Sequence, residues 1–379
     1  MERYLLDRAK LQPGDIVLQA GIMPHSKAIM LATGGRYSHA LLYDSNSMIE
    51  ATLSGGVFSK NPQRVLVRNP AHLAVYRMRS PLNTELLHTV MFTARQKTAA
   101  PYATIEAIGA AFRSRHSRSG ASSGQFCSRL VAQSFSAAGI QLVPNADFCS
   151  PHDLTQSPLL EQIHDVVRLA TPEDLKIYDS VDINLRNQRA TLRWVRRARV
   201  LAAKENQEIA GQSDVLKFLI DHPEHDDAVV ECIRSTTYLS NFNHDRAANA
   251  YRYNEDAFAR RLVEKGRDKE SFLRDEIGKE LSLIPRYGRN LAAMRQHAHH
   301  CLSYVEEHIL LYVSLLAQIE ERLKVILRVL SRIGSEEPGH AELASRLLQD
   351  VQAARLQIEL PDAPNPTRDA ARTKRDNSK

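Results

Sequence analysis

The chain has 379 residues, of which 43% are hydrophobic and 25% charged, and its formal net charge is +6. These values are typical of a globular chain that is long enough for two domains with buried cores, and they exclude a disordered protein or a dedicated polycation. The 4 cysteines lie far apart and form no CxxC pair, which argues against a disulfide scaffold or a zinc ribbon and favours a reducing compartment.

The first part of the chain predicts a small sheet. It opens without an apolar run long enough for a signal peptide, and no later run is long enough to cross a bilayer. We therefore expect a cytoplasmic protein, with export by a route that needs no cleavable signal as the alternative. Short apolar runs bounded by turn residues predict strands, and residues 21–35 predict a loop or short helix. The predicted strands cover residues 11–18, 37–43, 48–52, 64–68 and 72–78.

Two of these strands, 37–43 and 48–52, form a predicted β-hairpin. Side chains alternate between the two faces of a strand, so a connecting loop of two or four residues places His39 and Glu50 on the same face. Two residues that are opposite or diagonal on one face are close enough for the carboxylate to orient the imidazole. A three-residue loop would place them on opposite faces; His39 would then be a partly exposed strand histidine and Glu50 a solvated edge carboxylate.

Cys127 is the candidate nucleophile of the chain. It follows a loop rich in glycine and serine (120–124) and precedes an apolar-periodic segment that ends at Gly139, so it falls at the start of a predicted helix. The unpaired N–H groups and the positive dipole at a helix N-terminus lower the pKa of a thiol and favour the nucleophilic thiolate. The alternative is a small buried hydrophobic residue, which is the commoner role of a free cysteine.

Helices and a basic loop are predicted around Cys127. Helices are expected at residues 83–98 and 101–112, and the basic loop at 113–118 could guide an anionic substrate or could simply be solvated. Cys149 is interpreted as structural. Residues 150–157 carry helix-start residues, and 166–170 predict an edge strand.

The rest of the chain is predicted to be helical. Residues 184–210 form one predicted helix with 7 basic residues before its first acid, Glu205. Such a run could meet phosphates or an anionic membrane surface, or it could be a packed helix with solvated arginines. No nucleic-acid-binding motif accompanies it, so nucleic acid is not an expected partner.

The long periodic segment 289–333 predicts either the core of a bundle or a helix that self-associates or binds a protein partner. Within it, the histidines and cysteine of 297–301 could hold a metal, but no complementary ligands can be placed beside them, so a solvated helix face is expected. The other predicted helices cover 214–221, 224–240, 246–265 and 269–284, and the tail 361–379 is expected to be disordered.

The order of four short motifs resembles a known family. The chain has Pro-Gly-Asp-Ile-Val at 13–17, Tyr-Ser-His-Ala at 37–40, Ile-Glu-Ala at 49–51 and Phe-Cys-Ser-Arg-Leu-Val at 126–131. This order is similar to that of the circularly permuted papain-like amidases, relatives of the NlpC-type cysteine peptidases, in which the histidine strand precedes the cysteine helix. The resemblance covers residues 11–170 and includes a Pro-x-Asp-Leu-x-x-Ser ending at 151–157. The family usually has an acid two places after the cysteine, where this chain has Arg129.

The resemblance implies a site. Cys127 matches the nucleophile, His39 the general base and Glu50 the residue that orients the base. The oxyanion of the intermediate would be held by the backbone N–H of Cys127. Weaker candidates for contacts with the substrate or the oxyanion are Tyr102, which falls near a tyrosine that recurs in the family, Ser38 and Ser128.

The predicted fold class is α+β. A permuted papain-like domain at 1–182, with a small antiparallel sheet or barrel and a nucleophile helix, precedes an all-α bundle at 183–360 and the tail. The predicted function is hydrolysis of amide or peptide-like bonds through a thioester, with no cofactor and no metal, on a peptide, amide or acyl-lipid substrate. One alternative keeps the fold but acts as an acyltransferase or lipid hydrolase. Another is a non-catalytic papain-like scaffold with a helical interaction domain.

Overall fold

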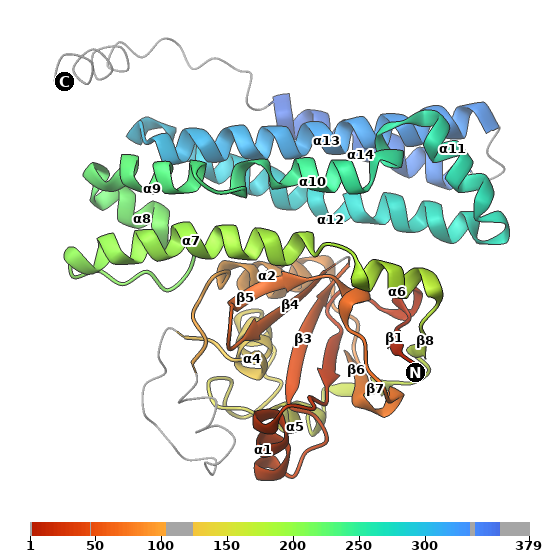
Figure 1. Cartoon of the computed structure of the whole chain (residues 1–379), viewed down its shortest axis with the longest axis horizontal. Coiled ribbons are helices and arrows are strands. Elements are labelled where there is room, and N and C mark those ends of the chain that lie inside the picture. Colours follow the sequence, from red (N-terminus) through yellow and green to blue (C-terminus); the bar gives the residue numbers. More distant parts are fainter. Residues whose placement is uncertain (1, 46, 104–123, 334–337, 357–379) are drawn as a thin grey trace. The chain divides into compact units, whose positions relative to one another are not determined.

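The structure is a computed structural model that describes residues 2–45, 47–103, 124–333 and 338–356. It is a mixed α+β chain in which small antiparallel sheets are followed by many helices (Figure 1). The chain divides into two compact units, Met1–Phe218 and Leu219–Lys379. The predicted loop at 113–118, most of the predicted helix at 101–112 and the tail at 361–379 lie outside the described residues.

The first unit is built on a six-stranded antiparallel sheet with the strand order β5-β4-β3-β2-β6-β7. The strands predicted at 11–18, 37–43, 48–52 and 72–78 are confirmed, whereas β5 and β7 have no counterpart among the predicted strands. The bounds are β2 Ile16–Gln19, β3 His39–Asp44, β4 Ser47–Thr52, β5 Gly56–Lys60, β6 Leu73–Met78 and β7 Leu160–Ile163. A separate two-stranded sheet pairs β1 (Tyr4–Leu6) with β8 (Val167–Leu169), which confirms the edge strand predicted at 166–170.

The strand predicted at residues 64–68 is wrong. Pro62–Arg64 is a 3₁₀ helix, η2, because the side chain of Asn61 accepts a hydrogen bond from the N–H of Gln63 and so caps the turn. Pro62 favours this turn as well, since its fixed φ suits the first helical position and its missing N–H costs nothing there. Beyond the turn, Val67 forms an isolated antiparallel bridge with Tyr4.

The register of the β3–β4 hairpin is that of an even loop. Asp44 pairs with Ser47, so two residues connect the strands. The same register places His39 opposite position 52 and Glu50 opposite position 41, which puts the two side chains diagonally on one face. The predicted shared face of His39 and Glu50 is therefore confirmed.

Both faces of the central strands are buried. Helices α2 (Thr84–Gln96) and α4 (Cys127–Ala137) pack on one face, against side chains that include Leu18, Ala40 and Leu42. The alternate residues, such as Val17 and Leu41, belong to a second apolar cluster on the opposite face. Because the strands are held from both sides, side chains at their ends have fixed directions. The smaller helices of this unit are α1 Pro24–Thr33, α5 Pro151–Thr155 and α6 Pro172–Asp179.

The helix predicted at 184–210 is α7, Ile183–Lys204, and it belongs to the first unit. The sequence placed the domain boundary after residue 182, but the compact units divide after Phe218. The reason is a set of hydrogen bonds that joins α7 and the segment after it to residues 98–99 of the first unit. The guanidinium of Arg199 donates to the carbonyl oxygens of Ala99, Ile209 and Ala210, and the N–H of Gln212 donates to the carbonyl of Thr98. Helix α8 (Asp214–Asp221) spans the division.

The second unit is helical. The predicted helices at 224–240 and 246–265 are each interrupted by 3₁₀ turns, whereas α12 continues through Pro285 because Ile284 and Leu291, on either side of it, are buried in the core. A single helix over 289–333 is wrong, because α12 ends at Gln296 and Cys301 has a left-handed backbone with φ 53°. The bounds are α9 Asp226–Arg234, α10 Asn241–Ala248, α11 Glu255–Glu264, α12 Lys269–Gln296, α13 Ser303–Ile333 and α14 Pro338–Leu356.

The apolar stripe of α13 is buried inside this unit, against α11, α12 and α14. Its residues Leu316, Ile319 and Leu323 are fully buried. Of the two predicted roles for this segment, the structure therefore shows the core of a bundle. Among the described residues, no helix has the length and apolar character needed to cross a membrane.

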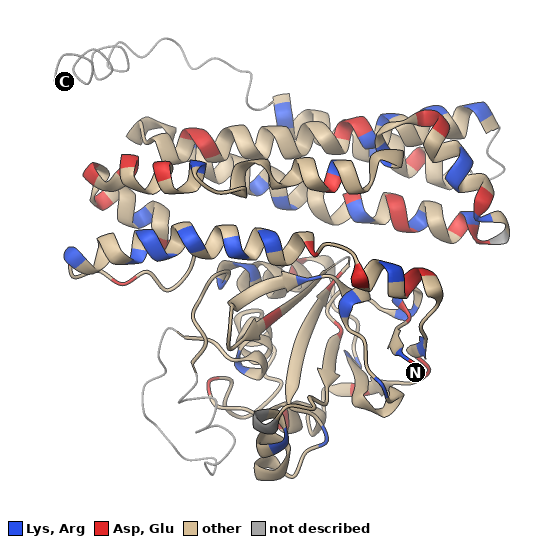
Figure 2. Cartoon of the chain, in the orientation of Figure 1, with Lys and Arg blue, Asp and Glu red and all other residues tan. Residues whose placement is uncertain are grey.

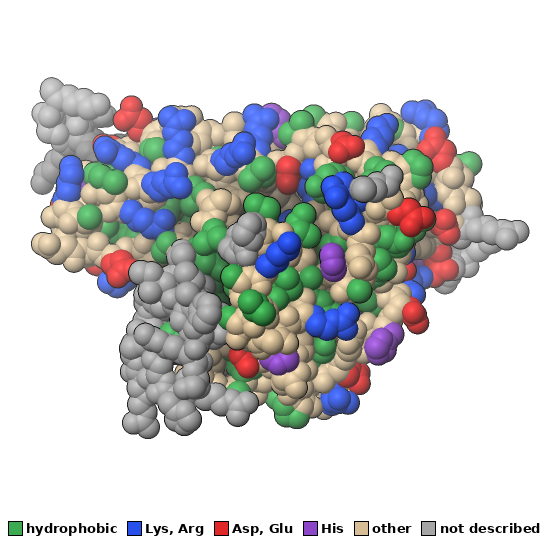
Figure 3. All heavy atoms as spheres, turned by 60° about the horizontal axis from the view of Figure 1, so that its bottom comes forward, with side chains coloured by type: hydrophobic (Ala, Val, Ile, Leu, Met, Phe, Trp, Pro, Cys, Tyr) green, Lys and Arg blue, Asp and Glu red, His purple; other side chains and the backbone are tan. Residues whose placement is uncertain are grey.

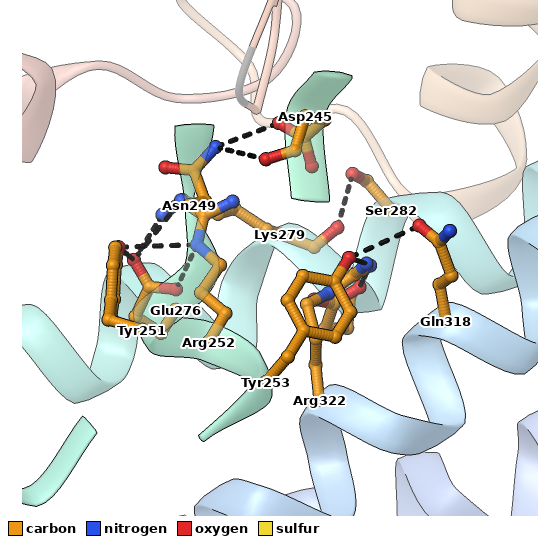
Figure 4. Close-up of polar contacts among 11 residues, drawn as sticks. Asp245, Asn249, Tyr251, Arg252, Tyr253, Glu276, Lys279, Ser282, Gln318 and Arg322 are labelled. Atoms are coloured by element: carbon orange, nitrogen blue, oxygen red, sulfur yellow. Dashed lines mark hydrogen bonds and ion pairs between the residues drawn. The ribbon is translucent and has the colours of Figure 1, made fainter. Parts of the chain in front are cut away.

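Buried charges cross the second unit beside this stripe (Figure 4). The guanidinium of Arg322 on α13 donates two hydrogen bonds of 2.7 Å to Glu280 on α12 and a third to the hydroxyl of Tyr253. One turn before Glu280, Glu276 accepts from Arg252 and from the hydroxyl of Tyr251. Arg322 and Glu280 are both buried, so this pair fixes how α12 and α13 face one another, while Arg252 ties the segment before α11 to α12.

Candidate active site

His39 and Glu50 meet at one edge of the β3–β4 hairpin. His39 is the first residue of β3, and its Nε2 lies 2.9 Å from Oε2 of Glu50 on β4. The other carboxylate oxygen of Glu50 lies 3.4 Å from Nζ of Lys60, which is on the neighbouring strand β5. Glu50 is thus held from both sides, and it fixes both the direction and the tautomer of the imidazole. Lys60 was missing from the predicted site because β5 was not predicted.

Cys127 is the first residue of α4, and α4 packs directly against β3. The sulfur is nearly enclosed: the residue is 5% exposed, and Sγ lies 4.0 Å from the carbonyl oxygen of Ser38. The imidazole of His39 and the backbone N–H groups of Ala40 and Ser128 lie near enough to the sulfur to lower the pKa of the thiol against the effect of burial. Since Nε2 of His39 is bonded to Glu50, the nitrogen that remains for the sulfur is Nδ1. The structure therefore brings the three predicted residues together in the predicted order, Glu50–His39–Cys127.

The electrostatics of the three groups favour an ion pair. Burial alone would lower the pKa of His39, but the hydrogen bond and charge of Cys127, followed by those of Glu50, raise it to about 10. Burial opposes ionisation of the thiol, yet the imidazole of His39 and the two backbone N–H groups hold the pKa of Cys127 below its ordinary value. Burial opposes ionisation of Glu50 too, but His39 and Lys60 keep the pKa of that carboxyl lowered. The shifts of Cys127 and His39 thus have the signs that favour a thiolate–imidazolium pair over a neutral thiol and imidazole.

This ion pair predicts how fast Cys127 is alkylated at different pH values. A lowered thiol pKa should keep the alkylation rate with iodoacetamide high well below about pH 8.5, where an ordinary cysteine slows tenfold per unit of pH. In His39→Ala the burial of the thiol is no longer opposed by the imidazole, so the rate at neutral pH should fall by at least about tenfold. Mass spectrometry of the alkylated peptide gives the rate for each cysteine. Overlapping pH profiles for the two proteins would contradict the ion pair.

Tyr102 lies beside the nucleophile. The structure gives residues 101–103 an extended form: Tyr102 forms a parallel bridge with Gln125, and the N–H of Ala103 donates to the carbonyl of Gln125 at 2.9 Å. Gly56 has φ 69° and lets the preceding segment approach, because a Cβ there would collide with the carbonyl of Ala100. Burial, and next the charge of Cys127, raise the pKa of Tyr102, so its hydroxyl stays protonated and can donate a hydrogen bond.

The two predicted serines have other tasks. The hydroxyl of Ser128 donates to the carbonyl oxygen of Cys149 at 2.6 Å, so the hydroxyl serves to hold the chain and the backbone N–H is the group that faces the sulfur. The hydroxyl of Ser38 accepts from the N–H of Gly21 at 2.9 Å. Cys149 is buried, and burial raises the pKa of its thiol, which agrees with a structural role.

Arg129 holds together the backbone segments on either side of α4. Its side chain is fully buried and donates to the carbonyl oxygens of Gly124 and Asp147, each at 2.8 Å. The guanidinium also lies over the ring of Phe126, 4.5 Å from its centroid. Arg129 therefore ties the segment before α4, at Gly124, to the segment after α4, at Asp147. Its charge could be read from the sequence, but its burial could not.

Among the described residues, His297, His299, His300 and Cys301 are not brought together with further ligands. His297, His299 and His300 lie at the end of α12 and in the 3₁₀ turn that follows, with stacked or tilted rings. Neither they nor Cys301 belong to a group of three ligand atoms that lie within 4.8 Å of one another. The broken helix explains this, since the predicted shared helix face does not exist.

No family model matches the chain, and no curated protein matches it. Among solved structures, the chain is similar to the metalloprotein yiiX of Escherichia coli O157:H7, described as DUF1105. The sequence identity is 22% and the TM-score 0.30, and the match covers 40% of this chain and 96% of that one. A likeness at this TM-score carries no argument about function, so the chemistry of the site rests on its own geometry.

Proposed function

We propose that this chain is a cysteine-dependent hydrolase of amide or peptide-like bonds on a permuted papain-like domain. The observation that supports this most directly is the position of His39, whose Nε2 is bonded to Glu50 at 2.9 Å while, against the effect of burial, the neighbouring Cys127 and Glu50 raise the pKa of its ring. Acyl transfer through a thiolate needs a nucleophile, a base and a residue that orients the base, in this order. The position of Cys127 at the start of α4 adds the donors that an oxyanion needs.

The first half of the reaction forms a thioester. The thiolate of Cys127 attacks the carbonyl carbon of the substrate, a C–S bond forms, and the electron pair of the C=O bond moves to the oxygen. This oxyanion is stabilised by the N–H of Cys127 in the first turn of α4, with the hydroxyl of Tyr102 as the second donor. The imidazolium of His39 then gives its proton to the leaving nitrogen, the C–N bond breaks and the amine departs.

The second half releases the acid. His39 is now neutral and accepts a proton from a water molecule, whose oxygen attacks the thioester carbon. A second tetrahedral intermediate collapses, the C–S bond breaks, and the thiolate leaves with the imidazolium beside it. Glu50 stays ionised throughout, because His39 and Lys60 lower its pKa, and it stabilises the positive ring in both halves.

A second candidate is a thiol-dependent acyltransferase or lipid hydrolase. The observation in its favour is an exposed apolar segment beside His39. Gln19 at the end of β2 pairs with His39, and the chain that follows exposes Ile22, Met23 and, on α1, Leu31, which is 85% exposed. Figure 3 turns the bottom of Figure 1 toward the reader and shows hydrophobic side chains exposed on that face. Such a surface suits an acyl chain.

The test is to identify what acylates Cys127. The full chain is incubated briefly with a set of N-acyl amino-acid amides and peptides, and separately with acyl lipids, and its intact mass is measured. The proposal expects an adduct from an amide or peptide that hydroxylamine removes, as it removes thioesters, and that Cys127→Ala does not form. Adducts from acyl lipids alone would support the second candidate. A protein without adducts whose Cys127 is also inert to iodoacetamide would be a non-catalytic scaffold.

A further inference from the structure

Helix α7 presents one continuous basic stripe. Its exposed basic side chains lie on one side of the helix, because most of them are separated from another by three, four or seven residues. The helix contains no acidic residue, so the charge is not neutralised within it. Figure 2 shows basic residues repeating along its length. The stripe consists of Arg186, Arg189, Arg193, Arg196, Arg197 and Lys204.

The opposite side of α7 fixes the stripe in place. Trp194, Val195 and Ala198 are fully buried, and Arg199 is anchored to three backbone carbonyls. The helix therefore cannot turn an apolar face outward, as a free amphipathic helix does when it enters a membrane. What it can offer to a partner is the basic stripe, on a rigid support.

Five of the charges of the stripe are available. Within the described part of the chain, Arg186, Arg189, Arg196, Arg197 and Lys204 form no ion pair with an acid. Such a density of unpaired positive charge attracts a polyanion or an anionic surface by several basic contacts at once.

Apolar side chains within the stripe decide between a membrane and a nucleic acid. Val200 is 56% exposed and lies between Arg196 and Lys204 on the same side, and Leu185, at the start of the helix, is also exposed. Tyr178 and Val181 are exposed just before the helix begins. Phosphate groups of a nucleic acid gain nothing from aliphatic side chains, whereas the interface of a bilayer accepts both basic and apolar groups.

We infer that α7 docks the protein on an anionic phospholipid surface. Basic residues within a Debye length of such a surface each strengthen binding about fivefold, so a stripe of this kind supports reversible attachment without any spanning segment. This inference rests on the surface of α7 and is independent of the proposed reaction at Cys127.

The test is co-sedimentation of the full chain with vesicles. One set contains phosphatidylcholine alone, the other phosphatidylcholine and phosphatidylserine in a two-to-one ratio. We expect binding to the second set alone, with loss of binding at high salt. The variant with Arg189→Gln, Arg196→Gln and Arg197→Gln should lower the partition coefficient by about a hundredfold, at about fivefold for each charge. Cys127→Ala should bind like the unchanged protein, which separates this test from the catalytic one.

A matched control removes the same charge elsewhere. Arg68, Arg260 and Arg346 are exposed and scattered, and their triple change to glutamine should leave vesicle binding close to that of the unchanged protein. Circular dichroism checks that both triple variants are folded. Equal binding by the two variants, equal binding to both vesicle sets, or tighter binding to a DNA duplex than to anionic vesicles would each overturn the inference.

Discussion

Cys127→Ala is expected to abolish turnover and thioester formation, and His39→Ala to lower turnover by at least about a thousandfold. The first change removes the atom that attacks the substrate. The second removes the group that lowers the pKa of this atom and protonates the leaving nitrogen, since the imidazole is bonded to Glu50 and acts on the thiol of Cys127. Glu50→Gln keeps the shape but loses the charge that stabilises the imidazolium, so we expect a smaller loss, on the order of a hundredfold.

Steady-state rates on the substrate found by acylation give these numbers. Cys232→Ala is the matched control, because it removes a partly exposed thiol from the second unit and should change neither rate nor labelling. Turnover that survives in Cys127→Ala, or a thiol probe that reacts with Cys232 before Cys127, would contradict the assignment. A pattern in which Glu50→Gln is as inactive as Cys127→Ala would assign Glu50 a larger part than orientation.

Arg322→Met is expected to lower the free energy of unfolding of the helical unit by about 3–5 kcal/mol. The side chains of Arg322 and Glu280 are 9% and 4% exposed, so removing the arginine leaves a buried carboxylate without its charged partner. The attraction of Glu280 is strong enough to raise the pKa of Arg322 even though burial opposes it. Removing both charges, with Glu280→Leu and Arg322→Met together, should restore most of the lost stability.

Urea unfolding measures this effect unit by unit. Trp194 is the single tryptophan and lies in the first unit, so its fluorescence reports that unit, while far-ultraviolet circular dichroism reports the helices as a whole. In Arg322→Met the circular dichroism transition should move to lower urea and the Trp194 transition should stay. If the double variant is no more stable than Arg322→Met, the pair contributes through packing and not through its charges.

The position of each residue of the predicted triad within its own element could be predicted because it depended on local rules. A two-residue connection fixes the parity of the β3–β4 hairpin, and parity alone places His39 and Glu50 on one face. The position of Cys127 followed from a glycine-rich loop before a periodic apolar segment. These signals lie within ten or so residues of the atoms they position, and tertiary contacts did not override them.

Other features could not be read from the sequence, because they depend on distant partners. Strand β5 is short and ends in polar residues, and it exists because it pairs with β4 and receives Ala99 and Ala100 on its other side. Apolar periodicity continues across the break at residues 297–302, so the pattern could not show that α12 and α13 are separate helices. The burial of Arg129 likewise depends on carbonyls at positions 124 and 147.

The first turn of α4 has a further consequence. The position before Cys127 is occupied by Phe126, whose side chain accepts no hydrogen bond from the helix, although a serine or aspartate there would typically add about 1 kcal/mol of stability. Such a side chain would accept from the N–H of Ser128 or Arg129, and the N–H of Ser128 is one of the groups that lower the pKa of the thiol. A capping residue at position 126 would therefore raise stability but lower turnover. A variant selected for heat resistance would be expected to gain its stability elsewhere in the chain.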